Sequence, residues 1–215
     1  MGARVTTFCA VLRTAAPGAD AADRLVSSCG RMIPMPIQRW WAPPSSGELA
    51  ILGDALPAVL DVGCGPARHV LALEARGVRA VGLDSSEEAV RAARARGAAV
   101  HHGSIFDEVP DAGRWGSALL FDGNIGIGGD PEVLLGRVRR VLRARGRALV
   151  EVEPPEVRTA SFVVRAGSPA GPVGDWFPWA QVSATDLPRL AAASGFGLAA
   201  LVEAEGRWFG RLERR

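Results

Sequence analysis

The chain has 215 residues, of which 48% are hydrophobic and 22% are charged. This length suits one domain with a modest appendage, and the apolar content is ample for a core, which excludes global disorder. No apolar run approaches the roughly 20 residues of a membrane helix. All 25 basic residues are arginine, but 23 acidic residues leave a net charge of only +2, so we expect neither a nucleic-acid nor a membrane partner.

The cysteine content bears on the compartment. Cys9, Cys29 and Cys64 are too few for a disulfide framework, and their spacing suits no metal site. The short apolar stretch near the N-terminus is broken by Arg13, which disfavours a signal peptide. We therefore expect a cytoplasmic protein without a metal, and the sequence leaves its oligomeric state open.

The N-terminal part of the chain differs in pattern from the rest. Residues 1–44 lack helical periodicity and are rich in proline, so we interpret them as a cap laid on a domain of residues 45–215. Ser45 and Glu48 have the spacing of a capping box and predict a helix that leads into the first strand. Strands are then predicted at 58–62, 78–83, 98–102, 117–121 and 148–152, with helices that begin at Pro66, at a Ser85–Glu88 capping box and at Asp130-Pro131.

This alternation predicts right-handed crossovers and an open parallel sheet. Residues 154–182 interrupt it with proline, glycine and aromatic residues, and are interpreted as an insertion over the substrate pocket with one strand at 161–165. A helix after Ser183 and an antiparallel hairpin of residues 198–203 and 207–212 close the chain. The expected fold is an α/β three-layer sandwich whose seven-stranded sheet is mostly parallel with an antiparallel last strand.

The strongest chemical signal is residues 59–68, VLDVGCGPAR, where a glycine turn connects a strand to a helix. Such a turn lets the backbone approach a ligand closely. The dinucleotide fingerprint G-x-G-x-x-G would require a third glycine at position 68, which is Arg68. The segment instead resembles the first motif of class I S-adenosylmethionine-dependent methyltransferases, E/D-x-G-x-G-x-G, with Asp61, Gly63 and Gly65 in place and Ala67 at the third glycine.

The resemblance covers about residues 57–152 and implies a Rossmann-like fold that binds S-adenosylmethionine. A carboxylate at the first strand end suits the cationic amino group and sulfonium of that cofactor, and Asp84 would accept hydrogen bonds from both ribose hydroxyls. Ser104 stands where many members have an acidic residue for the adenine amino group, while Ile105 could offer backbone contacts. The candidate cofactor-binding residues are therefore Asp61, Gly63, Cys64, Gly65, Asp84, Ser85, Ser104, Ile105 and Phe121.

The same resemblance places the transferred methyl group and the substrate beside the end of the fourth strand. Asp122 follows that strand, and Asn124 is the only asparagine in the chain. We take both as candidate catalytic residues, with Asp122 as a candidate base, while Gly123-Asn124 can equally form a simple turn. His69, in the first turn of the helix after the glycine loop, is expected to have a packing role.

Aromatic residues gather outside the alternating core, which suggests a roof over a pocket for an apolar or aromatic acceptor. Trp40, Trp41, Trp176 and Trp179 are the candidate substrate-binding residues. The sequence thus predicts an enzyme that methylates oxygen, nitrogen or carbon of a small molecule, as in secondary metabolism. Two alternatives remain: an NAD(P)-dependent oxidoreductase, disfavoured by Arg68 and the absence of tyrosine, and a non-catalytic S-adenosylmethionine-binding protein.

Overall fold

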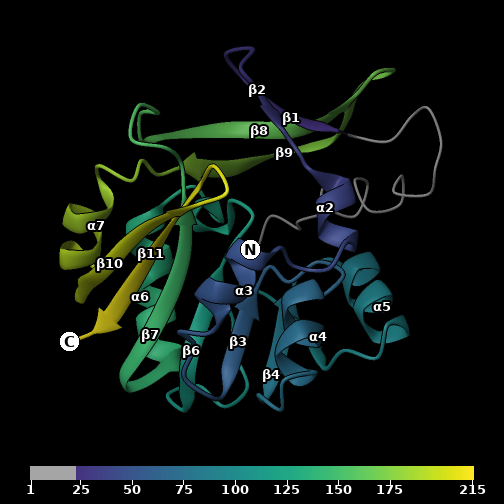
Figure 1. The fold of residues 1–215 in the computed structure, drawn as a ribbon. Helices are drawn as coiled ribbons and strands as arrows, with labels where there is room; N and C mark the ends of the chain where they lie inside the picture. Colours follow the sequence, from purple (N-terminus) through teal and green to yellow (C-terminus); the bar gives the residue numbers. More distant parts are fainter. Residues whose placement is uncertain (1–22) are drawn as a thin grey trace.

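The computed structural model describes residues 23–215, and Cys9 with the first half of the expected cap lies outside these residues. These residues form two sheets. The larger has seven strands and is covered by helices, and the smaller has four strands. Figure 1 shows the small sheet lying across the end of the large one at which the parallel strands have their carboxyl termini. Ligands of open α/β sheets bind at that edge, so the small sheet covers the expected site.

The large sheet has the strand order β10-β11-β7-β6-β3-β4-β5. Its parallel strands are β3 (Val59–Val62), β4 (Ala80–Asp84), β5 (Val100–His102), β6 (Trp115–Leu120) and β7 (Leu142–Val152). The closing hairpin consists of β10 (Phe196–Ala204) and β11 (Arg207–Arg214), and β11 pairs antiparallel with both β10 and β7. This arrangement confirms the predicted seven-stranded sheet with an antiparallel last strand.

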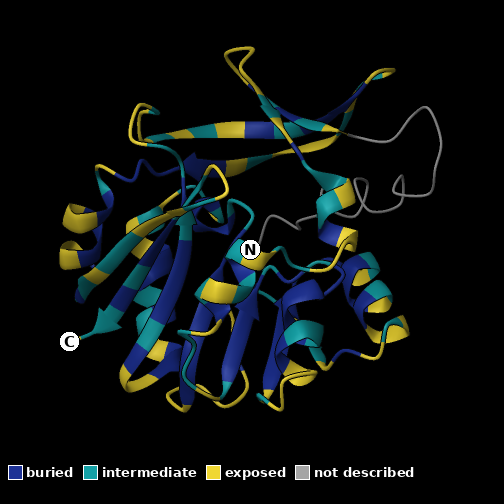
Figure 2. Cartoon of the chain, viewed as in Figure 1, coloured by how far each residue is buried: buried dark blue, intermediate teal, exposed yellow. Residues whose placement is uncertain are grey.

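Helices cover both faces of this sheet. One face carries α3 (Ser46–Leu52), α4 (Arg68–Glu74) and α5 (Glu87–Ala95), and the other carries α6 (Pro131–Val141) and α7 (Leu187–Ala193). The central strands are buried along their whole length, as Figure 2 shows, because helices cover them on both sides. Neighbouring strand residues such as Val59 and Leu60 therefore enter different core clusters, and the three-layer sandwich is confirmed.

Helix starts follow local capping chemistry. Ser45 and Glu48 form the predicted capping box of α3. The helix after the glycine turn begins two residues later than predicted, because Ala67 adopts a left-handed conformation with φ of 65°. Ser86 caps α5 by accepting the N–H of Ala89, and since that third residue is an alanine, the predicted capping box does not form there.

The small sheet joins two segments that are distant in the sequence. Its order is β2-β1-β8-β9, and the strands are β1 (Arg24–Ser27), β2 (Met32–Pro34), β8 (Ala160–Ser168) and β9 (Gly171–Gln181). The prediction of one strand in the insertion was wrong, since the insertion supplies a long hairpin and β1 pairs with it. The prolines at 172 and 178 obscured β9 in the sequence, yet an edge strand tolerates proline.

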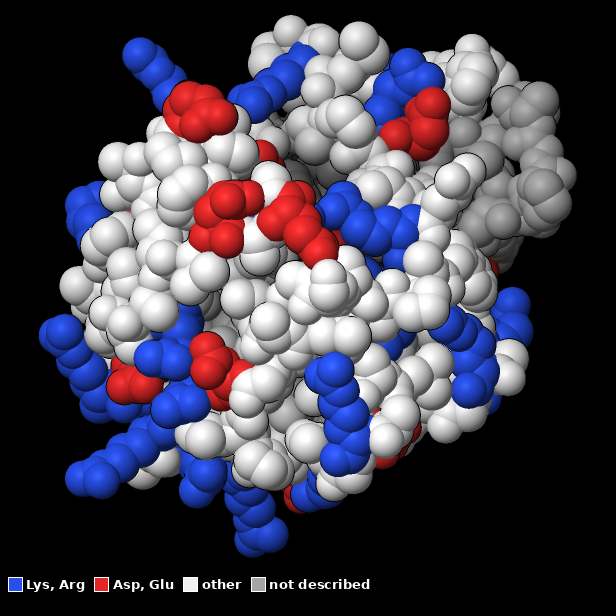
Figure 3. Space-filling model, in the orientation of Figure 1, with Lys and Arg blue, Asp and Glu red and all other residues white. Residues whose placement is uncertain are grey.

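A short helix, α2 (Ile37–Trp41), leads from the small sheet to α3 and places Trp40 in the interior. Across residues 23–215, every helix is too short or too polar to cross a membrane. On the face shown in Figure 3, arginine side chains gather at the end of the molecule opposite the small sheet. On this face (Figure 3), arginine is therefore less dense at the edge that the small sheet covers than at the opposite end of the molecule.

Candidate active site

The glycine turn after β3 has an unusual backbone. Gly63, Gly65 and Ala67 all have positive φ, of 71°, 54° and 65°. Alternate residues in this left-handed region curl the chain tightly; glycine adopts this conformation without a steric penalty, whereas Ala67 adopts it at some cost. The turn is tied to β4, because the N–H of Gly63 donates to the carbonyl oxygen of Leu83 over 2.7 Å.

Asp84, the last residue of β4, forms a second tie to this turn. Its carboxylate oxygens accept hydrogen bonds from the backbone N–H groups of Gly65 (2.9 Å) and Ser86 (2.8 Å). Burial raises the pKa of Asp84, while these two hydrogen bonds act in the opposite direction. Within residues 23–215 Asp84 has no ion-pair partner. The carboxylate is thus held in a fixed position with its charge uncompensated by arginine.

Asn124 lies in a 3₁₀ turn, Asn124–Gly126, and its side chain reaches the glycine turn. Its amide nitrogen donates to the carbonyl oxygens of Val62 and Gly63, each over 2.9 Å. A Cβ atom on Gly63 would lie only 2.7 Å from this nitrogen. The only asparagine of the chain therefore connects the end of β6 with the turn after β3, and the contact also demands a glycine at position 63.

Below the turn, five charged side chains from separate elements form what we call the arginine–carboxylate network. Arg68 bonds Glu48 over 2.5 and 2.8 Å. Arg207 contacts Glu48 over 2.6 Å and Glu151 over 2.5 Å. The network consists of Glu48, Arg68, Asp122, Glu151 and Arg207. It fastens α3, α4, β7 and β11 to the loop after β6, so the floor of the site is rigid.

Asp122, the candidate base, is a member of this network. Arg68 donates to both of its carboxylate oxygens over 3.0 and 2.9 Å, and Arg207 donates to Oδ1 over 3.1 Å. Its own N–H donates to Glu151 over 2.5 Å, and its φ is 55°. Most lone pairs of this carboxylate are used by two guanidinium groups, an arrangement that suits positioning better than proton transfer.

His69 has a larger role than packing. The imidazole Nε2 lies 3.4 Å from Glu48 and Nδ1 lies 3.5 Å from Asp61, while the ring meets Phe121 edge-on at 5.1 Å. Burial disfavours the charged ring, but the interactions with Asp61 and Glu48 prevail and raise the pKa of His69 to about 9. The imidazolium therefore links the acid of the glycine motif to the arginine–carboxylate network.

Two neighbouring hollows lie at this edge. The cofactor cleft, of about 30 Å³, is lined by the glycine turn, Asp84, Asn124 and Trp40. The acceptor cavity, of about 320 Å³, lies between the small sheet and the ends of β6 and β7. Trp40 and Asp122 line both hollows, so the two are adjacent.

The structure brings some of the sequence-predicted residues into these hollows and not others. Gly63, Cys64, Gly65, Asp84, Asp122 and Asn124 line the cleft. Asp61, Ser85, Ser104, Ile105 and Phe121 are not among its lining residues. Asp61 and Phe121 are each 1% exposed and lie behind the turn.

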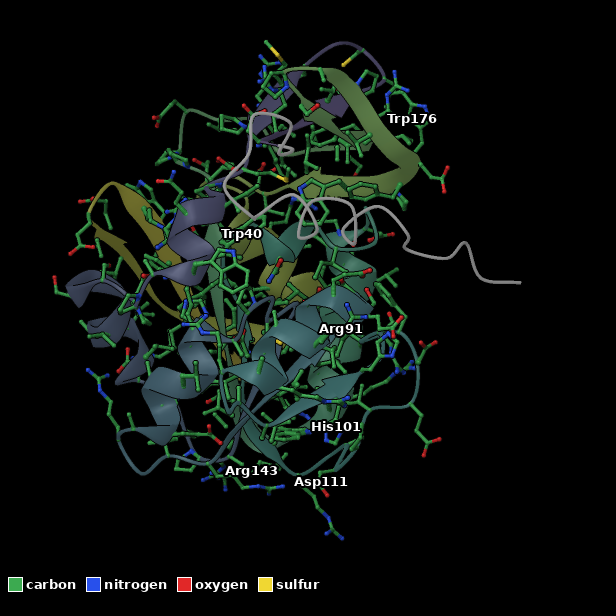
Figure 4. The ribbon with its side chains drawn as sticks, turned by 90° about the vertical axis from the view of Figure 1, so that its right-hand side faces the viewer. Trp40, Arg91, His101, Asp111, Arg143 and Trp176 are labelled. Carbon is green, nitrogen blue, oxygen red and sulfur yellow. The ribbon has the colours of Figure 1, made fainter. Side chains whose placement is uncertain are left out.

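The four candidate tryptophans divide in the same way. Trp40 and Trp179 line the acceptor cavity. Trp41 and Trp176 are 39% and 45% exposed, and their rings lie under arginine guanidinium groups at 5.8 and 4.5 Å. Figure 4 shows Trp40 between the two parts of the molecule, whereas Trp176 lies at the outer edge of the small sheet.

Sequence reasoning missed six polar or charged residues of the site: Arg39, Glu48, Glu151, Glu153, Gln181 and Arg207. Glu48 was assigned only to a capping box, a role that it also fills. A signal existed for Glu153, which directly follows a predicted parallel strand and so belongs to the carboxyl edge. No local pattern marks Arg207, because its partners are brought to it by the fold.

Comparisons with known proteins agree with this geometry. A family described as a methyltransferase domain matches residues 59–146. A methyltransferase from Bacteroides fragilis, described as S-adenosylmethionine-dependent and solved with S-adenosylhomocysteine, superposes with a TM-score of 0.76 at 22% identity, over 99% of this chain and 96% of that one. No curated protein sequence matches the chain.

Two further structures share the fold. A 1,6-didemethyltoxoflavin-N1-methyltransferase from Burkholderia thailandensis has a TM-score of 0.57 at 17% identity, over 78% of this chain and 76% of that one. An amino pentose methyltransferase from Micromonospora echinaspora has a TM-score of 0.55 at 21% identity, over 77% and 86%. Residues 59–146 of this chain therefore match a methyltransferase domain, and the chain shares the fold of these three methyltransferase structures.

Proposed function

We propose that the chain transfers the methyl group of S-adenosylmethionine to a small molecule that binds in the acceptor cavity. One observation carries the proposal: the cavity adjoins the cofactor cleft through Trp40 and Asp122. A volume of about 320 Å³ lies at the small end of the range for ligand pockets. The small sheet, built from the cap and the insertion, forms the roof that keeps water from the reacting atoms.

The residues of the cleft fit this cofactor. The buried acid Asp84 lines the cleft beside the glycine turn and has no ion-pair partner within residues 23–215, whereas Asp61 lies behind the turn and faces His69. The negative charge of Asp84 favours a ligand with a cationic amino group and sulfonium. Asp84 would hold the ribose hydroxyls, and the backbone of Gly65 would face the cofactor. When bound, S-adenosylmethionine supplies a methyl group on a sulfonium that is an intrinsically good leaving group.

The relatives support a small acceptor through their descriptions. The Burkholderia structure contains 1,6-didemethyltoxoflavin, and the Micromonospora protein is described as an amino pentose methyltransferase. In this chain we assign positioning roles to Asp122 and Asn124, since their polar groups are engaged by Arg68, Arg207 and the glycine turn. Alignment of the acceptor with the methyl group and exclusion of water then account for most of the rate acceleration.

Calorimetry followed by turnover tests the proposal. We expect S-adenosylhomocysteine to bind with a dissociation constant of about 1–100 μM and NAD⁺ to give no binding heat. Mass spectrometry of reactions with S-adenosylmethionine and a panel of small amines, phenols and carbon acids should then detect an acceptor that gains one methyl group. Absence of S-adenosylhomocysteine binding would contradict the cofactor assignment. Binding without any methylated product across the panel would favour a non-catalytic cofactor-binding protein.

A further inference from the structure

The acids that line the acceptor cavity are not equivalent. Asp122 and Glu151 are both bound by Arg207, at 3.1 and 2.5 Å. Glu153, which lines the same cavity, has no ion pair within residues 23–215. Arg39 also lines the cavity, but its nearest carboxylate is Asp122, at 3.9 Å. Glu153 is thus the carboxylate of this cavity whose charge no arginine neutralises at contact distance.

The backbone holds Glu153 in place on both sides. Its N–H donates to the carbonyl oxygen of Val182, and its own carbonyl oxygen accepts the N–H of Ala184, each over 2.8 Å. Glu153 also forms an isolated parallel bridge with Ser183, so the end of β7 is fastened to the chain that leaves the insertion. The carboxylate therefore extends from a fixed backbone at the base of the cavity.

The charges around Glu153 leave its carboxylate in a poorly compensated environment. Burial is the largest influence and raises the pKa of Glu153, the hydrogen bond from Gln181 lowers it, and neighbouring Glu151 raises it further. Arg31, in the turn between β1 and β2, lowers it by a smaller long-range effect. A carboxylate in this setting gains more from a cationic ligand than one already paired with arginine.

Gln181, from β9, provides a second acceptor beside it. Its amide nitrogen donates to Oε1 of Glu153 over 3.1 Å. Because a carboxylate only accepts hydrogen bonds, the amide must present its NH₂ group to Glu153 and its oxygen elsewhere. That oxygen is buried and has no hydrogen-bond partner within residues 23–215, on a side chain that is only 7% exposed. Two acceptors therefore lie at the cavity wall: the Glu153 carboxylate, to which the Gln181 amide donates, and the Gln181 oxygen, which has no hydrogen-bond partner among the described residues.

The rest of the wall is largely apolar. Leu25, Met35, Trp40 and Trp179 line the cavity and are buried. Indole rings attract cationic groups through their electron-rich faces, and the aliphatic side chains favour a hydrocarbon body. This combination suits a molecule with one cationic, hydrogen-donating end and an apolar remainder.

We propose that the methyl acceptor is an apolar-bodied primary or secondary amine, whose protonated amino group is bound by Glu153 and the side-chain oxygen of Gln181. The inference rests on the proposed function and names its substrate class. A neutral hydroxyl could donate a single hydrogen bond, whereas an ammonium group donates to both acceptors and matches the charge of the carboxylate.

The same carboxylate completes the proton balance of the reaction. The bound ammonium gives one proton to Glu153 and becomes a neutral amine with a free lone pair. That lone pair forms a bond to the methyl carbon while the carbon–sulfur bond breaks, and its electrons remain on sulfur as the thioether of S-adenosylhomocysteine. The product is a methylated ammonium, so one positive charge moves from sulfur to nitrogen and the proton stays on Glu153 until product release.

Matched probes test this inference on the full chain loaded with S-adenosylhomocysteine. Benzylamine and benzyl alcohol have nearly the same size and differ in the charged, multiply donating group. We expect benzylamine to bind about tenfold more tightly at pH 7.5 in nuclear magnetic resonance titrations. Glu153→Gln should remove this preference, and Gln181→Leu should weaken benzylamine binding by several-fold while benzyl alcohol is unaffected. Glu156→Gln, an exposed acid nearby, is the control and should keep the preference.

Each outcome bears on the inference separately from the proposed function. Equal affinity for the two probes would overturn the amine assignment, and so would a preference for benzylamine that persists in a Glu153→Gln variant. In either case, binding of S-adenosylhomocysteine would still support the cofactor assignment. Failure of S-adenosylhomocysteine to bind the wild-type chain would overturn both. If Glu153→Gln does not fold, Glu153→Asp replaces it, and it must retain the preference for benzylamine because the charge is kept.

Discussion

The side-chain amide of Asn124 donates a hydrogen bond of 2.9 Å to the carbonyl oxygen of Gly63. A second bond of equal length reaches Val62, so one NH₂ group spans the last residue of β3 and the first of the turn. The loop after β6, which faces the acceptor cavity, is in this way coupled to the turn that faces the cofactor cleft.

We predict that Asn124→Ala lowers both the stability of the chain and its affinity for S-adenosylhomocysteine. Removal of two hydrogen bonds to nearly buried carbonyl groups should reduce the free energy of unfolding by about 1–3 kcal/mol. The loosened turn should weaken cofactor binding by about tenfold. Urea denaturation and calorimetry measure the two effects. A variant with wild-type stability and affinity would show that the amide is dispensable for the turn.

Trp40 is one of the residues that line the narrow cofactor cleft. The cleft has about 30 Å³, enough for about one water molecule, whereas ligand pockets usually have several hundred. Trp40 lines the cleft from α2, and we expect this side chain or its helix to move when the cofactor enters. We predict that Trp40→Ala increases the association rate constant of S-adenosylhomocysteine by several-fold in stopped-flow fluorescence.

The neighbouring tryptophan supplies the control for that experiment. Trp41 is 39% exposed and lines neither hollow, so Trp41→Ala should leave the association rate unchanged. Equal acceleration in both variants would indicate a general loosening of α2 rather than removal of an obstruction. An unchanged rate in Trp40→Ala would contradict the idea that this ring limits entry.

The carboxylate of Asp84 should be a major determinant of cofactor affinity. Asp84→Ala removes the acceptor of the Gly65 N–H and the proposed partner of the ribose hydroxyls. Charge-assisted hydrogen bonds contribute about 1.5–3 kcal/mol each, so we predict a loss of affinity for S-adenosylhomocysteine of tenfold or more. Asp107→Ala, an exposed acid in the loop after β5, is the matched control. Undiminished affinity in a folded Asp84→Ala variant would refute the ribose assignment.

The central sheet could be predicted because its signals are local. Buried parallel strands give short apolar runs, and glycine or proline punctuates the helices between them. The glycine motif was also local, since Asp61, Gly63 and Gly65 lie within one turn of chain. The small sheet is different, because β1 finds its partner in β8 across most of the chain. Long-range pairing of this kind leaves no periodic signal in either segment.

The errors among the tryptophans have a simple geometric origin. Trp179 lies in the regular part of β9 opposite Phe162 and lines the cavity, whereas Trp176 lies where the register of β9 shifts, between Val173 and Phe177. Trp40 and Trp41 are consecutive on a helix and diverge by about 100°. Composition identified an aromatic-rich roof, but only the backbone conformation decides which rings face the cavity.

The arginine–carboxylate network was beyond sequence reasoning for another reason. Its members come from α3, α4, the loop after β6, β7 and β11, and each alone resembles an ordinary surface charge. Although burial raises the pKa of Glu48, contacts with His69, Arg68 and Arg207 prevail and hold it far below the usual range. His69 was assigned to packing because its acidic partners are brought together only by the fold.

The pH dependence of stability should reveal the buried imidazolium of His69. Its pKa is raised from 6.5 to about 9 in the folded chain, which corresponds to about 3 kcal/mol. Because the folded value is the higher one, this stabilisation is complete below pH 6.5 and is lost as the pH rises through about 9. We predict that the free energy of unfolding of the wild-type chain declines by about 2–3 kcal/mol over this interval.

His69→Gln, which keeps hydrogen-bonding capacity but cannot titrate, should be less stable at pH 6.5 and should show a flatter profile. His101→Gln, on β5, should retain the wild-type slope. Urea denaturation at a series of pH values measures all three profiles, and parallel curves for wild type and His69→Gln would show that the ring is uncharged in the folded chain.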